Sequence, residues 1–203
     1  MTAGTVVLLR HGQTDYNVAM RLQGQTDIPL NETGRAQAAE AASVVAGLSP
    51  TAIVASDLSR AADTAAAVAD LLELPVTTDP RLRERDFGEW EGLHGDVIAE
   101  RWPDDYALWR GGGHPESVGA ERRGEVGVRF AAGVADAASA LSSDDTLLVV
   151  AHGACIAAGI TAMLGLDADD WGGISGLGNC HWSVLTATER EPGWRLGAHN
   201  VGA

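Results

Sequence analysis

Two histidines of this 203-residue chain each stand at the end of an apolar run and directly before a glycine. His11 follows "VVLLR", and His152 follows "LLVVA". An imidazole can act as a nucleophile, a proton carrier or a hydrogen-bond donor. Arg10 places a cation beside the first imidazole, and guanidinium groups bind phosphate and carboxylate oxygens. The opening motif is therefore suited to chemistry on an anionic substrate.

A single histidine at a strand end is usually a structural residue, so the case depends on convergence. Successive strand residues point to opposite faces, and Arg10 and His11 can face one ligand only where the chain leaves the strand. Gly12 permits that departure. Arg60, in "SDLSRAADTA", follows a third apolar run. The pattern predicts that these strand ends bring the two histidines and the two arginines together.

Apolar runs alternate with helical patterns along most of the chain. Each expected strand precedes an expected helix; the pairs are 5–9 with 31–48, 51–57 with 58–72, and the run ending at Ala151 with the run after it. Such alternation is typical of a parallel sheet that binds ligands beyond the carboxyl ends of its strands. We expect one α/β domain over residues 1–203, with three α/β/α layers and a mostly parallel central sheet flanked by helices.

The middle and the end of the chain depart from this alternation. Residues 81–95 are charged and punctuated by glycine, so an ordered loop is expected there. A helix over 95–110 should be interrupted by Pro103, and a long helix should follow over roughly 118–141. The segments "NCHWSVLTAT" and "GWRLGAHN" flank a turn and predict a β-hairpin at or near an edge of the sheet. Such an edge would allow two copies to pair as a homodimer.

The charge balance excludes several classes of partner. All fourteen basic residues are arginine, against 28 acidic residues, for a formal net charge of −14. Nucleic acids and anionic membranes demand basic patches that such a chain can hardly assemble. Without lysine the chain has no Schiff-base nucleophile and no lysine-dependent phosphate loop. An anionic substrate would therefore need a local cluster of arginines.

The N-terminal residues and the cysteines bear on the compartment. No basic leader precedes the first apolar run, and no run approaches the ~20 apolar residues that cross a bilayer, so a cytoplasmic location is expected. Cys155 and Cys180 lack metal-ligand spacing to another cysteine. We expect both to be reduced residues of the core.

Four motifs occur in one order: "LLRHGQTDYN", "SDLSRAADTA", "LRERDFGEWEG" and "VVAHG". In this order and at these intervals they resemble branch 1 of the histidine phosphatase superfamily, which has the phosphoglycerate mutase-like fold. The resemblance covers nearly the whole chain. Within the family the chain is most similar to actinobacterial glucosyl-3-phosphoglycerate phosphatases, through "RHGQTDYN", "RLQGQTD", "GLGN" and "WRLGAHN".

The resemblance implies a metal-independent phosphomonoesterase in which His11 is the nucleophile and carries the phosphoryl group as phosphohistidine. A nucleophilic imidazole must be neutral, and Arg10 and Arg60 would hold its pKa down by charge repulsion. Once a phosphate dianion binds, the same guanidinium groups would bind its oxygens through forked hydrogen bonds. Neither a metal nor another cofactor is then required.

Glu84, in "LRERDFGEW", matches the acid of the family. It would protonate the leaving oxygen and later deprotonate the water, which requires a pKa raised by partial burial. Asp86, Glu89 and Glu91 are close enough in the sequence to compete for this role. The sequence leaves that choice open.

The remaining candidates complete the expected site. His152 would donate a hydrogen bond to phosphate, as a cation when the dianion is bound. Asn17 and Gln23 resemble family residues that reach the phosphate or the substrate from the loop after the first strand. Gly24 belongs to the same loop and could bring its backbone near the substrate. Three tryptophans could line a sugar-binding wall, but bulky aromatics beside helices are more often core residues; they are Trp90, Trp102 and Trp109.

The alternative functions are a cofactor-dependent phosphoglycerate mutase, another phosphatase of the family, and an inactive relative. Mutases of this superfamily have longer insertions in the region corresponding to 85–117, with basic residues that include lysine. This chain is short there and has no lysine, which favours hydrolysis. Broad-specificity and α-ribazole phosphate phosphatases carry the first four motifs too. An inactive relative would usually lack the nucleophile or an arginine, and this chain keeps both.

Overall fold

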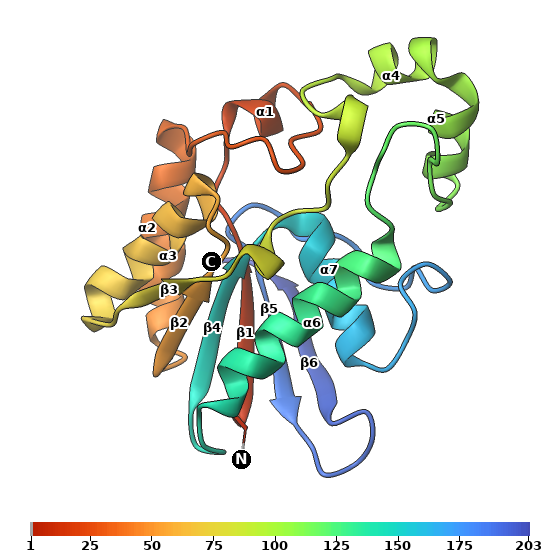
Figure 1. Cartoon of the computed structure of the whole chain (residues 1–203). Helices are drawn as coiled ribbons and strands as arrows, with labels where there is room; N and C mark the ends of the chain where they lie inside the picture. The colour runs from red at the N-terminus through yellow and green to blue at the C-terminus, as the bar shows by residue number, and fades with distance from the viewer. Residues whose placement is uncertain (1) are drawn as a thin grey trace.

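The computed structural model describes residues 2–203 and contains one six-stranded sheet with helices on both faces (Figure 1). The strands lie in the order β3-β2-β4-β1-β5-β6. Their bounds are β1 Thr5–Arg10, β2 Ala52–Ala55, β3 Val76–Thr78, β4 Thr146–Ala151, β5 Trp182–Ala187 and β6 Trp194–Val201. The first four strands of this order are parallel, and β5 and β6 are antiparallel to their neighbours. The expected three-layer fold with a mostly parallel sheet is confirmed.

The central strand β1 is apolar on both faces because helices cover both. Val6 and Leu8 pack with residues of α6 (Arg123–Ser139) and α7 (Gly153–Met163). Val7 and Leu9 pack with residues of α2 (Glu32–Ala46) and α3 (Ser59–Leu72). All four side chains are fully buried. Removing this apolar surface from water on both faces is the main favourable contribution to the fold.

The pairing of β1 with β4 places the two histidine motifs side by side. The strands are parallel, and their register pairs Arg10 with Ala151. The backbone N–H of His11 then donates to the carbonyl oxygen of Ala151 at 3.0 Å. His152, which follows Ala151, is the N-cap residue of α7. The register therefore brings both imidazoles to the carboxyl end of the sheet, as the sequence predicts.

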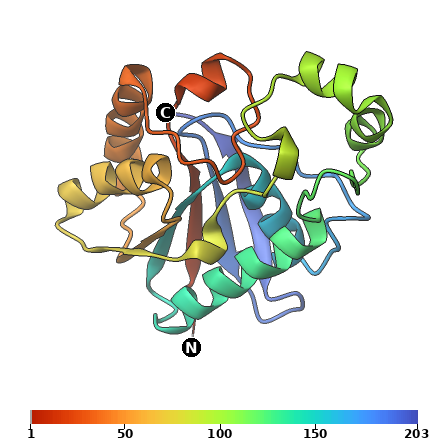
Figure 2. The same cartoon turned by 45° about the horizontal axis from the view of Figure 1, so that its top comes forward.

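Two helices stand above that end of the sheet, as Figure 2 shows from a tilted view. They are α4 (Gly95–Arg101) and α5 (Pro103–Arg110), and the break between them falls at Pro103 as expected. Trp90 is fully buried beneath them and makes edge contacts with Tyr106 and Trp109. These helices have a small aromatic core of their own, which also holds Phe87, Ile98 and Val118.

The long helix expected over roughly 118–141 is present as α6, but its predicted start is wrong, since α6 begins at Arg123. The preceding segment is bound to the loop opposite it. The carbonyl oxygen of Val118 accepts from the N–H of Glu89, and the N–H of Glu121 donates to the carbonyl oxygen of Asp86. These hydrogen bonds link segments about thirty residues apart, so no local pattern reports them.

Three short elements also lie where a loop was expected. The helix α1 (Asp15–Val18) begins with a capping box in which Thr14 and Asn17 bond to each other's backbone N–H. Single 3-10 turns form at Pro80–Leu82 and at Gly88–Trp90. Each of these elements is only three or four residues long, which is too short for hydrophobic periodicity to reveal.

The C-terminal hairpin is confirmed, with β6 at the edge of the sheet. Cys155 and Cys180 are both buried, as expected of core residues, and are not joined by a disulfide. Within residues 2–203, every helix is too short or too polar to span a bilayer.

Candidate active site

His11 and His152 form the centre of the site. Their ring centroids lie 5.1 Å apart, with the planes inclined by 60°. His11 is 2% exposed and His152 is fully buried. Both follow directly from the ends of paired parallel strands, so the sheet fixes their separation.

The hydrogen bonding of His11 determines which ring nitrogen can react. Its Nδ1 lies 2.7 Å from the carbonyl oxygen of Gly12, which can only accept, so Nδ1 carries the hydrogen. The lone pair therefore belongs to Nε2. Gly12 is required at the turn, because a Cβ there would lie 2.4 Å from the carbonyl oxygen of Gly34 in α2. The same peptide is held by its N–H, which donates to the hydroxyl of Thr64.

The pKa of His11 is well below its ordinary value of 6.5. Burial is the largest cause, because it disfavours the charged imidazolium, and the charges of Arg10 and Arg60 add to it. The neutral ring predicted from the sequence is therefore present. The sequence attributed it to the two arginines, but burial contributes more.

Arg60 is fully buried on the first turn of α3 and is held by three acceptors. Its Nη2 donates to the carbonyl oxygen of Gly24 at 2.8 Å, and its Nη1 donates to that of Thr26 at 2.9 Å. Its Nε donates to Nδ1 of His152 at 3.2 Å. No carboxylate pairs with this guanidinium among the ion pairs of residues 2–203, so its positive charge is retained in the site.

His152 is neutral in the unliganded protein. Burial lowers its pKa well below the ordinary value, and the charge of Arg60 and the neighbouring His11 ring lower it further. Because Nδ1 accepts from Arg60, the ring hydrogen is on Nε2, and this atom is buried without a partner. Nε of Arg10 is likewise a buried donor without a partner. Two N–H groups that need an acceptor thus lie at the centre of the site.

A cavity of about 470 Å³ opens at the carboxyl end of the sheet. Seven of the eight residues predicted from the sequence lie on its wall: Arg10, His11, Asn17, Gln23, Gly24, Arg60 and Glu84. The eighth, His152, is not among the lining residues, and its ring packs against the ring of His11. The predicted residues are therefore brought together from five separate segments of the chain.

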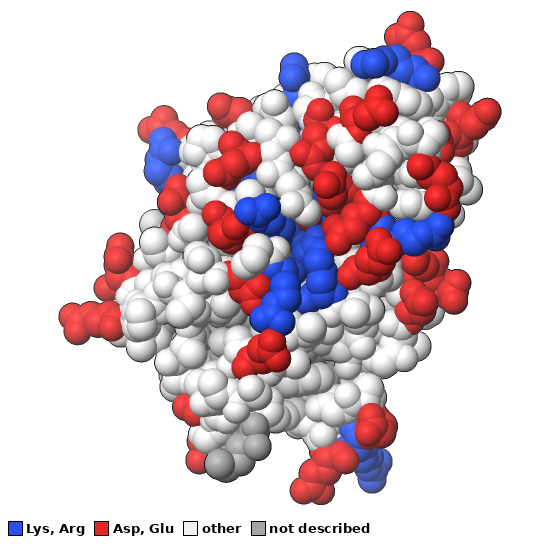
Figure 3. Space-filling view, viewed as in Figure 1, with Lys and Arg blue, Asp and Glu red and all other residues white. Residues whose placement is uncertain are grey.

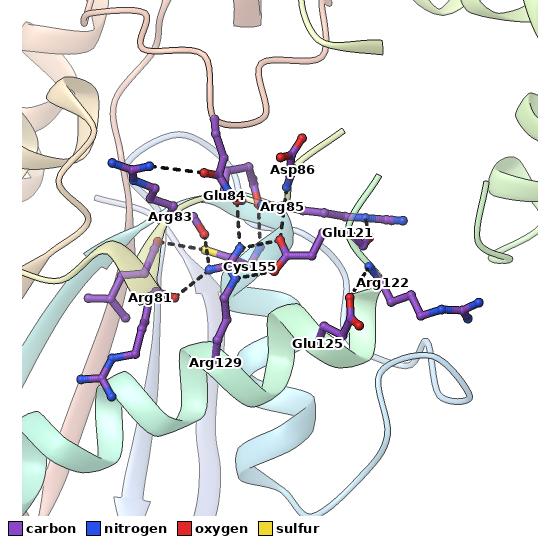
Figure 4. A network of polar contacts seen from close by, with 12 residues as sticks. Arg81, Arg83, Glu84, Arg85, Asp86, Glu121, Arg122, Glu125, Arg129 and Cys155 are labelled. Carbon is purple, nitrogen blue, oxygen red and sulfur yellow. Dashed lines mark hydrogen bonds and ion pairs between the residues drawn. The ribbon is translucent and has the colours of Figure 1, made fainter. Parts of the chain in front are cut away.

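The carboxylate of Glu84 lies at the N-terminus of α7. Its Oε1 accepts from the N–H of Cys155 at 2.8 Å, and its Oε2 accepts from the N–H of Ala154 at 3.0 Å. Figure 4 shows Glu84 above Cys155, with Arg129 reaching up from α6. Arg129 donates to the carbonyl oxygens of Arg81, Arg83 and Glu84, so it fixes the loop that carries Glu84.

The other acidic residues of this loop are engaged elsewhere and are absent from the cavity wall. Asp86 accepts from the N–H of Gly88, and Glu89 is exposed. Glu91 accepts from the N–H groups of Gln25 and Thr26 and from the hydroxyl of Thr26. The geometry therefore favours Glu84 over Asp86, Glu89 and Glu91 as the residue that protonates the leaving oxygen.

The loop after β1 depends on this Glu91. Gly24 has a φ of +54°, and a Cβ there would lie 1.8 Å from Oε1 of Glu91, so the position favours glycine. The carbonyl oxygens of Gly24 and Thr26 are the ones that hold Arg60. Gly24 thus serves the site through its bond to Arg60 as well as through its place on the wall. Glu91 is a positioning residue that the sequence analysis weighed only as an acid.

Asn17 and Gln23 present their amide groups in a defined orientation. Oδ1 of Asn17 accepts from the N–H of Thr14 and from Nδ2 of Asn179. Oε1 of Gln23 accepts from the hydroxyl of Thr14. With both oxygens engaged, the NH₂ groups are left as donors on the cavity wall.

The sequence analysis missed several residues of the wall. Arg85 and Arg123 line the cavity, as does Arg21, although none of them belongs to a strand-end motif. Their approach depends on loops and on α6, so no spacing in the sequence signals it. Of the three tryptophans considered for a sugar wall, Trp109 lies on the cavity, Trp90 is core, and Trp102 packs beside that core.

Arginine side chains line the cavity and also occur at other places on the surface of this acidic molecule (Figure 3). Figure 3 shows arginine side chains concentrated at the centre of one face, with acidic side chains around them. Within residues 2–203, no cluster of three or more histidine, cysteine or acidic side chains is placed to hold a metal ion. The site offers arginines and imidazoles, which suit an anionic ligand.

Comparison with known proteins agrees with this chemistry. The model of the histidine phosphatase superfamily (branch 1) matches residues 6–201. The glucosyl-3-phosphoglycerate phosphatase of Mycolicibacterium vanbaalenii is 39% identical over 218 residues, covering 100% of this chain and 97% of that protein. A probable phosphoglycerate mutase of Enterobacter sp. is 36% identical, covering 80% of this chain and 76% of that protein.

A solved structure extends the likeness to three dimensions. The mycobacterial glucosyl-3-phosphoglycerate phosphatase in complex with VO3 superposes with a TM-score of 0.89 at 39% identity, covering 98% of this chain and 99% of that chain. The resemblance seen in the four motifs is confirmed, and so is the phosphatase activity it implies. The chain belongs to branch 1 of the histidine phosphatase superfamily and is a phosphatase, a phosphoric monoester hydrolase.

Proposed function

We propose that the protein hydrolyses glucosyl-3-phosphoglycerate through a phosphohistidine formed on Nε2 of His11. The observation that carries the mechanism is the hydrogen bond from Nδ1 of His11 to the carbonyl oxygen of Gly12. It leaves the lone pair of Nε2 free to attack, and the lowered pKa keeps the ring neutral.

In the first step the Nε2 lone pair forms a bond to phosphorus while the bond from phosphorus to the ester oxygen breaks. Glu84 donates its proton to the departing oxygen, so the alcohol leaves without charge. In the second step water attacks phosphorus and gives its proton to Glu84, and the electrons of the P–N bond return to Nε2. The sum is ester and water converted to alcohol and inorganic phosphate.

The phosphoryl oxygens would be held by the donors that surround His11. Nε of Arg10 and Nε2 of His152 are buried N–H groups without a partner, and two phosphoryl oxygens would satisfy them. The amide NH₂ groups of Asn17 and Gln23 extend this set from the wall. Arg60 contributes a fixed positive charge against the charge of the transferring group.

The choice of substrate is supported by the relatives. The mycobacterial proteins that share 39% identity over the full chain are glucosyl-3-phosphoglycerate phosphatases. A phosphoglycerate mutase reaction is the second candidate, because a probable mutase aligns with 80% of the chain at 36% identity. The hydrolytic reaction and the mutase reaction differ in whether water reaches the phosphoenzyme.

The experiment is an assay of phosphate release from a panel of phosphorylated metabolites, with 3-phosphoglycerate also followed for conversion to 2-phosphoglycerate. We expect glucosyl-3-phosphoglycerate to give the highest kcat/KM, ahead of α-ribazole phosphate and simple sugar phosphates. Faster isomerisation of 3-phosphoglycerate than release of phosphate would establish the mutase instead. If a different ester gave the highest kcat/KM, glucosyl-3-phosphoglycerate would be rejected as the substrate, but the hydrolytic mechanism would stand.

A further inference from the structure

The short helix that carries Asn17 has little packing to hold it in place. None of the residues of α1 is buried. Val18, its last residue, is 62% exposed, and Met20, two positions later, is 82% exposed. Asn17 nevertheless lines the same cavity as His11. Because a helix this short is not fixed by buried apolar surface, hydrogen bonds must set where the amide of Asn17 lies relative to the nucleophile.

One side chain bridges these two residues. Asn179 lies in the loop between α7 and β5, and its Nδ2 donates to the carbonyl oxygen of His11 and to Oδ1 of Asn17, both at 3.1 Å. An NH₂ group has two hydrogens and can serve both acceptors at once. Among residues 2–203 the other contacts of Oδ1 of Asn17 are with Thr14, in the same turn. Asn179 therefore joins the side chain of Asn17 to the backbone of His11.

The loop that carries Asn179 is itself held from two sides. The N–H of Gly178 donates to Oδ1 of Asn200, on β6, at 2.8 Å, and the N–H of Cys180 donates to the carbonyl oxygen of His11 at 3.3 Å. Cys180 has a φ of +55°, in the left-handed region that a cysteine rarely adopts. Such a conformation persists where the surrounding contacts impose it. The backbone on both sides of Asn179 is thus fixed, and its amide has a defined place.

We propose that Asn179 is a positioning residue for phosphoryl transfer, which holds the amide of Asn17 at a set place beside His11. Asn179 is not among the residues that line the cavity, so it acts on the phosphate through Asn17. The carbonyl oxygen of His11 also accepts from Cys180, so the peptide of the nucleophile stays bonded without Asn179. The inference rests on the proposed function, in which the NH₂ group of Asn17 donates to a phosphoryl oxygen.

The test is a double-mutant cycle with Asn17→Ala, Asn179→Ala and the double variant. It measures kcat/KM for p-nitrophenyl phosphate and the inhibition constant of inorganic phosphate, which occupies the phosphoryl part of the site alone. We expect kcat/KM to fall about tenfold in Asn17→Ala and about fivefold in Asn179→Ala, as loss of a hydrogen bond would do. The double variant should stay near the loss of about tenfold, whereas independent roles would multiply to about fiftyfold. The inhibition constant of phosphate should rise in the same pattern.

Ser175→Ala is the matched control. Its hydroxyl belongs to the same loop and contacts Nε2 of His199 at 3.3 Å, away from His11 and Asn17. This variant also loses a hydrogen bond of the loop, and it should keep the wild-type kcat/KM and inhibition constant.

The outcomes separate this inference from the proposed function. Wild-type values in Asn179→Ala, or losses that multiply in the double variant, would overturn the inference and leave the phosphohistidine mechanism intact. Wild-type values in Asn17→Ala would remove Asn17 from the phosphate donors and overturn both that part of the proposed function and the inference.

Should Asn179→Ala fail to fold, Asn179→Asp decides, because it keeps the shape of the side chain. An ionised carboxylate cannot donate to either acceptor, so we expect kcat/KM to fall by about fivefold or more. Wild-type kcat/KM and phosphate inhibition in Asn179→Asp would reject the positioning role.

Discussion

The rings of His11 and His152 lie 5.1 Å apart because β1 and β4 are parallel neighbours whose register pairs Arg10 with Ala151. Each ring has one nitrogen tied to the protein, His11 through Gly12 and His152 through Arg60. One ring therefore offers a lone pair and the other offers an N–H. The sheet thus supplies a nucleophile and a donor at a fixed separation.

The stability of the protein should fall when the pH drops below about 6.5. The pKa values of His11 and His152 are lowered in the folded state, so the unfolded chain binds more protons in this range. Each histidine contributes a slope of about 1.4 kcal/mol per pH unit in the free energy of unfolding. Urea unfolding between pH 7.5 and 5 measures this slope.

His11→Asn should remove one of these two contributions, and His199→Asn on β6 serves as the control for loss of any histidine. The slope should decrease by about 1.4 kcal/mol per pH unit in the first variant, since one fewer proton is taken up on unfolding. Identical slopes in wild type and His11→Asn would show that the ring titrates normally in the folded state.

Glu84→Gln should slow the hydrolysis of substrates with poor leaving groups. An alkyl alcohol needs a proton as it departs, and the loss of a general acid costs about 10²- to 10⁴-fold in rate. Nitrophenolate leaves without a proton, so p-nitrophenyl phosphate should lose much less in its phosphorylation step. Burst kinetics with both substrates measure the difference, and Glu89→Gln, an exposed change in the same loop, is the control. Equal losses for the two substrates would assign the proton to another group.

Glu91→Gln should weaken substrate binding, although Glu91 is not on the cavity wall. The change removes the charge that orients Gln25 and Thr26, and the carbonyl oxygen of Thr26 helps to hold Arg60. We expect kcat/KM to fall about tenfold, mainly through KM, with the leaving-group dependence unchanged. A purely structural role would instead lower the melting temperature and leave KM of the folded enzyme at its wild-type value.

Chelators should leave the activity unaffected. Arginine and histidine donors supply the positive charge at the phosphate, so hydrolysis in the presence of EDTA should proceed at the rate seen without it. Vanadate should inhibit, because it adopts the geometry of the transferring phosphoryl group. Loss of activity in EDTA that added Mg²⁺ restores would contradict this prediction.

The centre of the site could be predicted from the sequence because it is built from residues at the ends of strands. His11 and His152 each follow a short apolar run, and parallel strands deliver their carboxyl ends to one edge of a sheet. Arg60 follows a third such strand and was found in the same way. Local patterns of five or six residues were sufficient here, since each motif is continuous in the chain.

The residues of the cavity wall that lie outside the strand-end motifs could not be predicted in this way. Arg85 and Arg123 are 38 positions apart in the chain, and both line the cavity. The segment before α6 hydrogen-bonds to the loop after Glu84 rather than continuing the helix. Burial is equally invisible to local patterns. It is the main cause of the lowered pKa of His11, whereas the sequence could point only to the neighbouring arginines.

The central claim is that Nε2 of His11 forms a bond to phosphorus during turnover. Rapid acid-free quenching of the enzyme with its phosphate ester, followed by peptide mass spectrometry, measures this directly. We predict a phosphoryl adduct on the peptide that contains His11, formed within the first turnover and absent from His11→Asn. Turnover with no adduct on that ring, or with an adduct that persists in His11→Asn, would contradict the mechanism.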